Sequence, residues 1–412
     1  MIEFYPGDWL APPQVFTQGL RSLFFFLTFV PACATIYNMP FCFAPWSNVD
    51  ISPVGDISPC CKFVTKQYNQ RFNIGEHTVQ QYRDSAFLQS IQQQFQSGQW
   101  PAGCTRCQIE EENKISSKRQ LDFERWQSHY VDYNLEQDGF ITASIAFGNT
   151  CNLTCITCSP YSSSRWRHEY QTIYLKDVKN FHFYKDDFVQ DFAKSAPQLI
   201  HIDIPGGEPF LSGVAEQKAL LQHYIDTDRA RNIMLHYTTN VTTWPDSEWW
   251  DLWQHFKEID MQLSIDGVGD RYNYIRYPGD WNQIQPNIQR YLGCQKLANF
   301  RLSVSHTVSA YNIYYLDEFF AWCYNAGLPT PWLGRVHSPA HMTPAVWCRY
   351  ARKAIADKLN SSQYPEVHAW SALVENTDDS EYLEDFKRYL QEHDRYRELN
   401  FKQVFPELAK YI

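Results

Sequence analysis

From about residue 140 onward, short apolar runs alternate with longer amphipathic stretches. Six runs rich in β-branched and aromatic residues predict strands, at 141–147, 199–204, 233–239, 261–265, 301–308 and 331–336. The intervening stretches are long enough for crossover helices, for example at 215–225, 247–256 and 315–326. This alternation predicts an α/β fold with parallel strands and right-handed crossovers. Six such units favour a partial (β/α)6 TIM barrel, whose chemistry would sit in the loops after the strands.

The residues on either side of this repeating pattern predict other kinds of structure. Prolines and glycines between 39 and 77 indicate turns and short strands, and a polar stretch at 78–99 reads as a helix. From residue 343 the chain is mainly helical, and its charged run at 381–398 predicts a solvated helix face. We therefore expect four parts, which are an uncertain N-terminal extension (1–38), a separate module (39–135), the partial barrel (140–342) and a helical tail (343–412).

The first part contains an apolar run at 22–30 that is too short to span a bilayer. It is preceded by acidic residues and a single Arg21, which makes a weak signal-peptide n-region. A packed extension and a chain whose translation starts at Met39 both remain open.

Charge and cysteine usage narrow the functional classes. The formal net charge of the 412 residues is −10, which argues against general binding to nucleic acid or to anionic membranes. Most of the twelve cysteines fall into tight groups. In a long chain of ordinary composition, such grouping predicts metal ligation in a reducing, cytoplasmic compartment rather than a disulfide framework.

The tightest group is the triplet Cys151, Cys155 and Cys158, which directly follows the first predicted strand. Spacings of four and three also match one face of a helix, but Gly148 and Pro160 indicate a loop. Thiolates are soft ligands suited to iron–sulfur clusters, and three of them leave one iron of a cubane cluster open. Zinc is the rival metal, but three thiolates alone do not close a structural zinc site.

The triplet resembles the CxxxCxxC loop of the radical S-adenosylmethionine (SAM) superfamily. That resemblance implies a 4Fe–4S cluster on the three cysteines and reductive cleavage of SAM to a 5′-deoxyadenosyl radical, which abstracts hydrogen from a substrate. It makes the three cysteines the catalytic metal ligands and implies an external reductant such as flavodoxin or ferredoxin.

Further motifs follow later strands and resemble the superfamily's SAM-binding elements. A GGEP turn would contact the SAM amino group through its glutamate, and its glycines would permit close backbone approach. An SxD pair resembles the ribose-binding element, and an arginine in the next segment would lie near the SAM carboxylate. The resemblance therefore implies these cofactor-binding residues: Gly206, Gly207, Glu208, Asn240, Ser264, Asp266 and Arg276. Val241 departs from the pattern, because relatives carry glycine after the asparagine.

A second set of cysteines lies upstream of the barrel pattern. Four thiolates from two separated pieces, Cys42, Cys60, Cys104 and Cys107, could close one metal site. The layout resembles a twitch or SPASM-like auxiliary-cluster module placed before the barrel, which implies an auxiliary 4Fe–4S cluster. A zinc site fits the same spacing, and the choice between Cys60 and the adjacent Cys61 stays open.

The resemblance as a whole implies a radical SAM iron–sulfur oxidoreductase acting on a peptide or a small metabolite. The alternative is a scaffold protein, either stabilised by zinc or binding SAM without turning it over.

Overall fold

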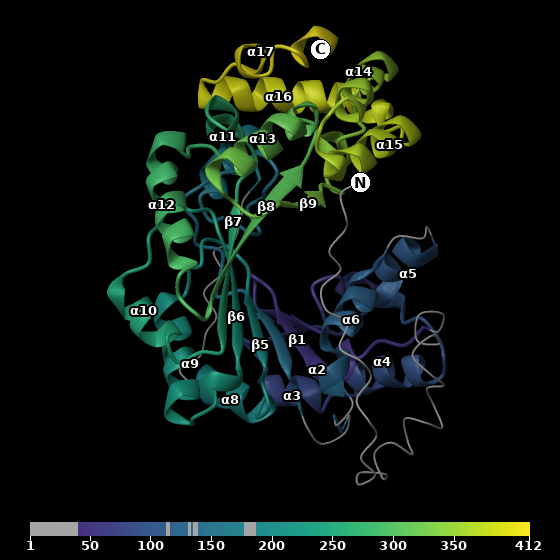
Figure 1. Cartoon of the computed structure of the whole chain (residues 1–412). Helices are drawn as coiled ribbons and strands as arrows, with labels where there is room; N and C mark the ends of the chain where they lie inside the picture. Colours follow the sequence, from purple (N-terminus) through teal and green to yellow (C-terminus); the bar gives the residue numbers. More distant parts are fainter. Residues whose placement is uncertain (1–39, 113–115, 131–132, 135–138, 177–186) are drawn as a thin grey trace, which may run out of the picture.

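A computed structural model of the chain describes residues 40–112, 116–130, 133–134, 139–176 and 187–412. One sheet of nine strands organises them, in the order β3-β2-β1-β4-β5-β6-β7-β8-β9 (Figure 1). Its strands are β1 (Asn48–Ile51), β2 (Asp56–Ser58), β3 (Phe72–Asn73), β4 (Thr142–Ile145), β5 (His201–Ile204), β6 (Met234–Thr239), β7 (Glu258–Ser264), β8 (Phe300–Val308) and β9 (Trp332–Arg335).

The six strands predicted from the apolar runs are present as β4 to β9. Each pairs in parallel with the next along the chain. Helices connect them, as the alternation predicts: α7 (Trp166–Tyr174), α8 (Phe188–Ser195), α9 (Val214–Asp226), α10 (Ser247–Trp253), α11 (Asp270–Ile275), α12 (Trp281–Cys294) and α13 (Leu316–Ala326). The protein is therefore a mixed α/β fold built on a large parallel sheet.

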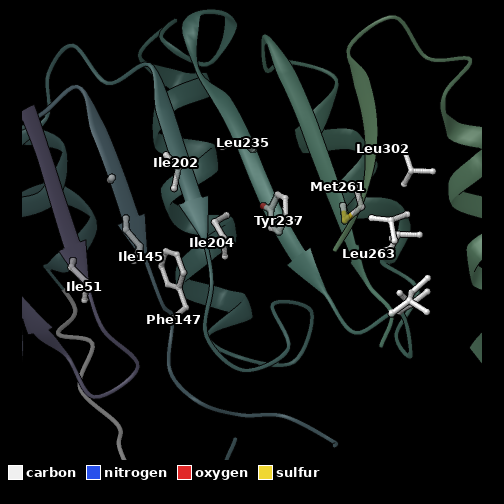
Figure 2. Packing of buried hydrophobic residues seen from close by; sticks show 14 of the residues in the cluster. Ile51, Ile145, Phe147, Ile202, Ile204, Leu235, Tyr237, Met261, Leu263 and Leu302 are labelled. Atoms are coloured by element: carbon white, nitrogen blue, oxygen red, sulfur yellow. The ribbon is translucent and has the colours of Figure 1, made fainter. Parts of the chain in front are cut away.

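One face of the sheet is apolar and packs against helices. Alternate residues such as Ile202, Leu235 and Tyr237 are buried and lie on this face (Figure 2). The Tyr237 ring packs against the indoles of Trp249 and Trp253 in α10, with centroid distances of 6.1 and 5.3 Å. Burial of large apolar side chains here supplies the main driving force for the crossover helices to dock.

The segment before the barrel pattern joins the same sheet. β1 pairs in parallel with β4, and the hairpin of β1 and β2 places two antiparallel strands at that edge. Its helices are α2 (Ala44–Ser47), α3 (Val79–Arg83), α4 (Ala86–Gln96), α5 (Thr105–Glu112) and α6 (Lys118–Tyr130). Thr78 and Ser85 cap α3 and α4 by accepting backbone N–H bonds, which explains why the helices begin there.

The tail is helical, with α14 (Arg349–Asn360), α15 (His368–Asn376), α16 (Leu383–Arg397) and α17 (Phe401–Val404). These helices form the yellow group beyond β8 and β9 in Figure 1. The charged run at 381–398, predicted as a solvated helix face, is only partly solvated. One side of α16 is buried, and it carries Phe386, Leu390, His393 and Arg397. The predictions for residues 1–38 lie outside the described residues. Among the residues described, no helix is long and apolar enough to cross a membrane.

Candidate functional site

The cysteine triplet lies in a loop directly after β4, so its alternative interpretation as a helix face is wrong. The loop is held by backbone hydrogen bonds to the last residue of α11 and to the segment that follows it. The Thr154 N–H donates to the Tyr277 carbonyl at 2.6 Å, and the Ile156 N–H donates to the Ile275 carbonyl at 2.7 Å. Ser163 Oγ donates to the Leu153 carbonyl at 2.6 Å. The backbone of the loop is therefore held from several sides before any ligand binds.

Burial and mutual proximity shape the chemistry of the three thiols. Desolvation raises the pKa of Cys151, Cys155 and Cys158, for Cys158 to about 12. The Arg276 guanidinium opposes this rise at Cys155 and Cys158. These thiols are thus protonated without a metal, and ligation must release their protons.

The GGEP turn after β5 packs directly on this loop. The Glu208 N–H donates to the Thr150 carbonyl at 2.8 Å, and a Cβ added at Gly207 would lie 2.2 Å from the same oxygen. Gly206 has φ +122°, a conformation that favours glycine. Both glycines are therefore required by the close approach of two loops of the chain.

Glu208 is fully buried, and its two carboxylate oxygens accept from the Thr239 hydroxyl and the Asn240 N–H, both at 2.8 Å. Desolvation raises the pKa of Glu208 to about 7, and the two hydrogen bonds limit the rise. A carboxyl with such a pKa is partly protonated near neutrality. A cationic group placed beside it would favour the charged form.

Asn240 joins the end of β6 to the cysteine loop. Its Nδ2 lies 3.7 Å from Cys151 Sγ and donates to Asn152 Oδ1 at 3.0 Å. The next residue, Val241, has φ +69°, a left-handed conformation that strains a β-branched residue. The backbone thus keeps the conformation expected of glycine at this position although the side chain is valine.

Asp266 and Arg276 form a buried ion pair, with Arg276 Nη2 and Asp266 Oδ2 2.8 Å apart. The Thr307 N–H donates to the other oxygen of Asp266 at 2.7 Å. Arg276 Nη1 lies 4.0 Å from Cys155 Sγ, while its Nε is buried and has no hydrogen-bond partner among the described residues. Ser264 Oγ lies 3.3 Å from Ser305 Oγ. Sequence reasoning assigned Asp266 and Arg276 to different parts of SAM and did not foresee their contact.

The upstream cysteines also come together. Cys42, Cys60, Cys104 and Cys107 line one pocket, together with Lys62, Lys118 and Arg119. Cys61 is exposed and does not line it, so the geometry favours Cys60 in this set. Burial raises the pKa of Cys42 to about 12, and the neighbouring Cys107 raises it further. Each of these three cations is ion-paired with a carboxylate, namely with Glu110, Asp122 and Glu111 respectively.

Neither cysteine set is arranged for a single ion. Within the described ranges, no group of three or more His, Cys, Asp or Glu side chains is placed to hold one metal ion.

Sequence reasoning missed the residues of α16 that hold the cysteine loop. Arg397 Nη2 donates to the Thr154 carbonyl at 2.7 Å, and Tyr389 Oη donates to the Ile156 carbonyl at 3.3 Å. The sequence offers one signal that this helix has a buried polar face. His393 and Arg397 are four residues apart and therefore lie on the same side of the helix.

Comparison with known proteins identifies the upstream module. The family model SPASM, an iron–sulfur cluster-binding domain, matches residues 42–108, which contain all four pocket cysteines. No curated protein matches the chain.

Several solved structures resemble parts of the chain. Native anSMEcpe with bound AdoMet is 18% identical over 47% of this chain and 52% of its own, with a TM-score of 0.36. Streptococcus suis SuiB bound to precursor peptide SuiA is 11% identical over 87% and 73%, with a TM-score of 0.36. The radical SAM methyltransferase TsrM from Kitasatospora setae, with cobalamin and a [4Fe-4S] cluster bound, is 14% identical over 48% and 34%, with a TM-score of 0.33. The chain thus spans about half the length of anSMEcpe, and likenesses this loose carry no functional conclusion.

Proposed function

We propose that the chain is a radical SAM enzyme, on the premise that residues 42–108 match the SPASM model of iron–sulfur cluster-binding domains. The observation that carries the proposal is the convergence of three motifs at the ends of neighbouring parallel strands. The Cys151 loop follows β4, Glu208 follows β5 and Asn240 follows β6. Asn240 contacts both of the others, through its backbone N–H to Glu208 and its side-chain amide to Cys151 Sγ. The finer architecture that we propose is a partial (β/α)6 barrel at 140–342, with an auxiliary module at 39–135 and the tail at 343–412.

Within this site, Cys151, Cys155 and Cys158 would ligate three irons of a 4Fe–4S cluster and leave the fourth for SAM. When bound, the cluster and SAM supply a 5′-deoxyadenosyl radical that abstracts hydrogen from the substrate. The unpartnered buried Nε of Arg276 supports this fit, because it is a donor for which the described residues supply no acceptor.

The remaining residues of the site bind and orient. Glu208 would accept a hydrogen bond from the SAM ammonium and lose its proton as the cation arrives. Arg276, fixed by Asp266, would donate to the SAM carboxylate. Asn240 and Ser264 would complete the cofactor contacts at the ends of β6 and β7. Burial of this set excludes water, which strengthens each of these electrostatic contacts.

Cys42, Cys60, Cys104 and Cys107 would hold an auxiliary 4Fe–4S cluster in the SPASM module. The substrate would be a peptide or a small metabolite, and a reductant such as flavodoxin or ferredoxin would deliver the electron that SAM cleavage needs.

Metal and sulfide analysis after anaerobic reconstitution tests this proposal. We expect about eight irons per chain in the wild type and about four in the Cys151/Cys155/Cys158→Ala variant. Dithionite should drive formation of 5′-deoxyadenosine from SAM only in the wild type. A Cys294/Cys323/Cys348→Ala variant, altered outside both sites, serves as the matched control and should keep both properties.

Two outcomes would replace the proposal. Stoichiometric zinc with negligible sulfide would indicate a zinc-stabilised scaffold. Two intact clusters that bind SAM without cleaving it would indicate a degenerate SAM-binding protein, an outcome for which the strained Val241 is the structural reason.

A further inference from the structure

The side chain of Asn240 uses all of its hydrogen-bonding groups within the chain. Its Oδ1 accepts from the Thr242 N–H at 3.0 Å and from the Thr242 hydroxyl at 2.6 Å. Its Nδ2 donates to Asn152 Oδ1 at 3.0 Å and to Cys151 Sγ at 3.7 Å. A side-chain amide has two acceptor lone pairs and two donor hydrogens. The chain itself therefore occupies every position that this amide could offer to a ligand.

The orientation of the amide is fixed by a group that can only donate. Because the Thr242 N–H faces one end of the amide, that end must be the oxygen, and the nitrogen must face Cys151. The neighbouring side chains agree. Asn152 Nδ2 donates to Thr242 Oγ1 at 2.8 Å, which leaves Asn152 Oδ1 as the acceptor for Asn240. The three polar side chains thus form a closed ring that directs one N–H at the cysteine sulfur.

The backbone around Asn240 is also held in place. The Asn240 N–H donates to Glu208 Oε2 at 2.8 Å, and the Tyr272 hydroxyl donates to the Asn240 carbonyl at 3.5 Å. The Val241 carbonyl accepts from Asn287 Nδ2 at 2.8 Å. These bonds explain how Val241 keeps its strained left-handed conformation. The Asn240 carbonyl oxygen, which has a second lone pair, is the polar atom of this residue that remains for a cofactor contact.

Several groups act on the Cys151 thiol, and they differ in what they can donate. Burial raises the pKa of Cys151 and the charge of Glu208 adds to that rise, whereas the Leu153 N–H, Ser163 and the Asn240 amide oppose it. Ser163 directs its hydroxyl hydrogen to the Leu153 carbonyl at 2.6 Å. Among these side chains, Asn240 is therefore the one that directs a hydrogen at the sulfur, from a position that is 7% exposed.

We infer that Asn240 is a positioning residue of the cluster site, and that its side-chain amide donates to the Cys151 thiolate and raises the reduction potential of the cluster instead of binding SAM. The inference rests on the proposed function and deepens it, because it changes the role that the sequence resemblance gives to this side chain. One electron from the external reductant enters the cluster in this step, and no bond forms or breaks.

The physical reason is the charge that reduction adds. The extra electron makes the sulfur ligands more negative, and a hydrogen bond strengthens as its acceptor becomes more negative. An N–H directed at Cys151 therefore stabilises the reduced cluster more than the oxidised one, and hydrogen bonds to sulfur are among the factors that set such potentials. Burial strengthens the effect, because water does not compete for the sulfur.

Redox titration of the reconstituted holoprotein without SAM, followed by electron paramagnetic resonance, tests the inference. The signal of interest is the part that the Cys151/Cys155/Cys158→Ala variant lacks. We expect Asn240→Ser and Asn240→Ala to lower the equilibrium constant for reduction by about tenfold, which for one electron is a potential about 59 mV lower. SAM affinity of the oxidised holoprotein should stay within about twofold of the wild type, because no side-chain contact to SAM is removed.

Two controls accompany these variants. Asn282→Ala, on the exposed side of α12, should change neither the potential nor the affinity. Thr242→Val removes the hydroxyl but keeps the N–H that orients the amide, so its potential should shift less than in the Asn240 variants. A measurement on the wild type needs no variant to fold. With asparagine side chains labelled with nitrogen-15, the reduced cluster should show a nitrogen-15 coupling, which Asn240→Ser should lose.

An unchanged potential in Asn240 variants that keep their iron overturns the inference. So does a loss of SAM affinity of about tenfold or more, which would assign the side chain to the cofactor. If the variants lose the cluster, the wild-type nitrogen-15 coupling decides, because its absence contradicts the hydrogen bond and its presence supports it. A protein that cleaves SAM but whose potential ignores Asn240 refutes this inference alone. A potential that shifts in a protein unable to cleave SAM refutes the proposed function alone, and a triplet without a cluster refutes both.

Discussion

Arg397 and Thr154 are 243 positions apart, yet the Arg397 guanidinium donates to the Thr154 carbonyl at 2.7 Å. The same guanidinium bonds Glu169 at 2.8 Å in a fully buried pair. Trp166 Nε1 donates to the Cys155 carbonyl at 3.2 Å. The last long helix of the chain is therefore part of the support that holds the central cysteine of the triplet.

Replacing this arginine should loosen the loop. In Arg397→Met, Glu169 loses its strongest cation while staying buried, so we expect the free energy of unfolding to fall by about 3 kcal/mol. Iron bound at the triplet should fall with it. Urea denaturation and iron analysis measure the two effects. Arg395→Met, on the exposed side of the same helix, should change neither. Equal behaviour of the two variants would contradict a supporting role for α16.

A methyl group at Gly207 should separate two loops that must touch. Its Cβ would lie 2.2 Å from the Thr150 carbonyl oxygen, so the Glu208–Thr150 hydrogen bond cannot form without a shift. We expect Gly207→Ala to lose roughly 1–3 kcal/mol of stability and to bind less iron. Gly293→Ala, in α12 with no atom within 4 Å of the added Cβ, should be as stable as the wild type or slightly more so. Thermal unfolding of the two variants compares them directly.

The pKa of Glu208, near 7, predicts a pH dependence for SAM binding. The carboxyl must be charged to attract the SAM ammonium, so affinity should rise as pH increases through about 7. Glu208→Gln should weaken binding by about tenfold or more and remove that part of the profile. Titration of the holoprotein with SAM at several pH values measures both, with the exposed Glu366→Gln as control. A profile that is unchanged in Glu208→Gln would assign the titration to another group.

The same raised pKa predicts a slope in the stability of the protein without SAM. The folded state keeps its proton on Glu208 up to about pH 7, whereas the unfolded chain releases it near the ordinary value of 4.5. Between these values the folded state binds more protons, so the contribution of Glu208 to stability decreases as pH rises. Urea denaturation from pH 5 to pH 8 should show this decrease in the wild type and a flatter profile in Glu208→Gln.

The auxiliary pocket distinguishes Cys60, which the sequence favours as a ligand, from the adjacent Cys61, which the sequence leaves open as the alternative. Cys60 lines the pocket and Cys61 is exposed. Cys60→Ser should therefore lose about four of about eight irons, while Cys61→Ser keeps them all. Iron and sulfide analysis after reconstitution decides between them. The reverse pattern would make Cys61 the ligand and require the turn after β2 to rearrange.

Local patterns were sufficient to predict the strands and the order of the motifs. The runs that became β4 to β9 carry their own periodicity, and each motif follows its strand within a few residues. The spacing of the upstream cysteines likewise anticipated the SPASM match at 42–108. Such features can be predicted from short stretches of sequence, because the conformation of a strand or a turn depends mainly on residues that are close along the chain.

Contacts between distant segments were decided only by the tertiary structure. The parallel pairing of β1 with β4, the buried pair of Asp266 and Arg276, and the reach of Arg397 to the cysteine loop leave no periodic trace in the sequence. Register likewise pairs Asp203 of β5 with His236 of β6, and a shift of one residue would turn a side chain to the other face. The sequence by itself therefore determined which groups are available for chemistry, and packing determined which of them meet, because through-space partners depend on register and docking rather than on local preference.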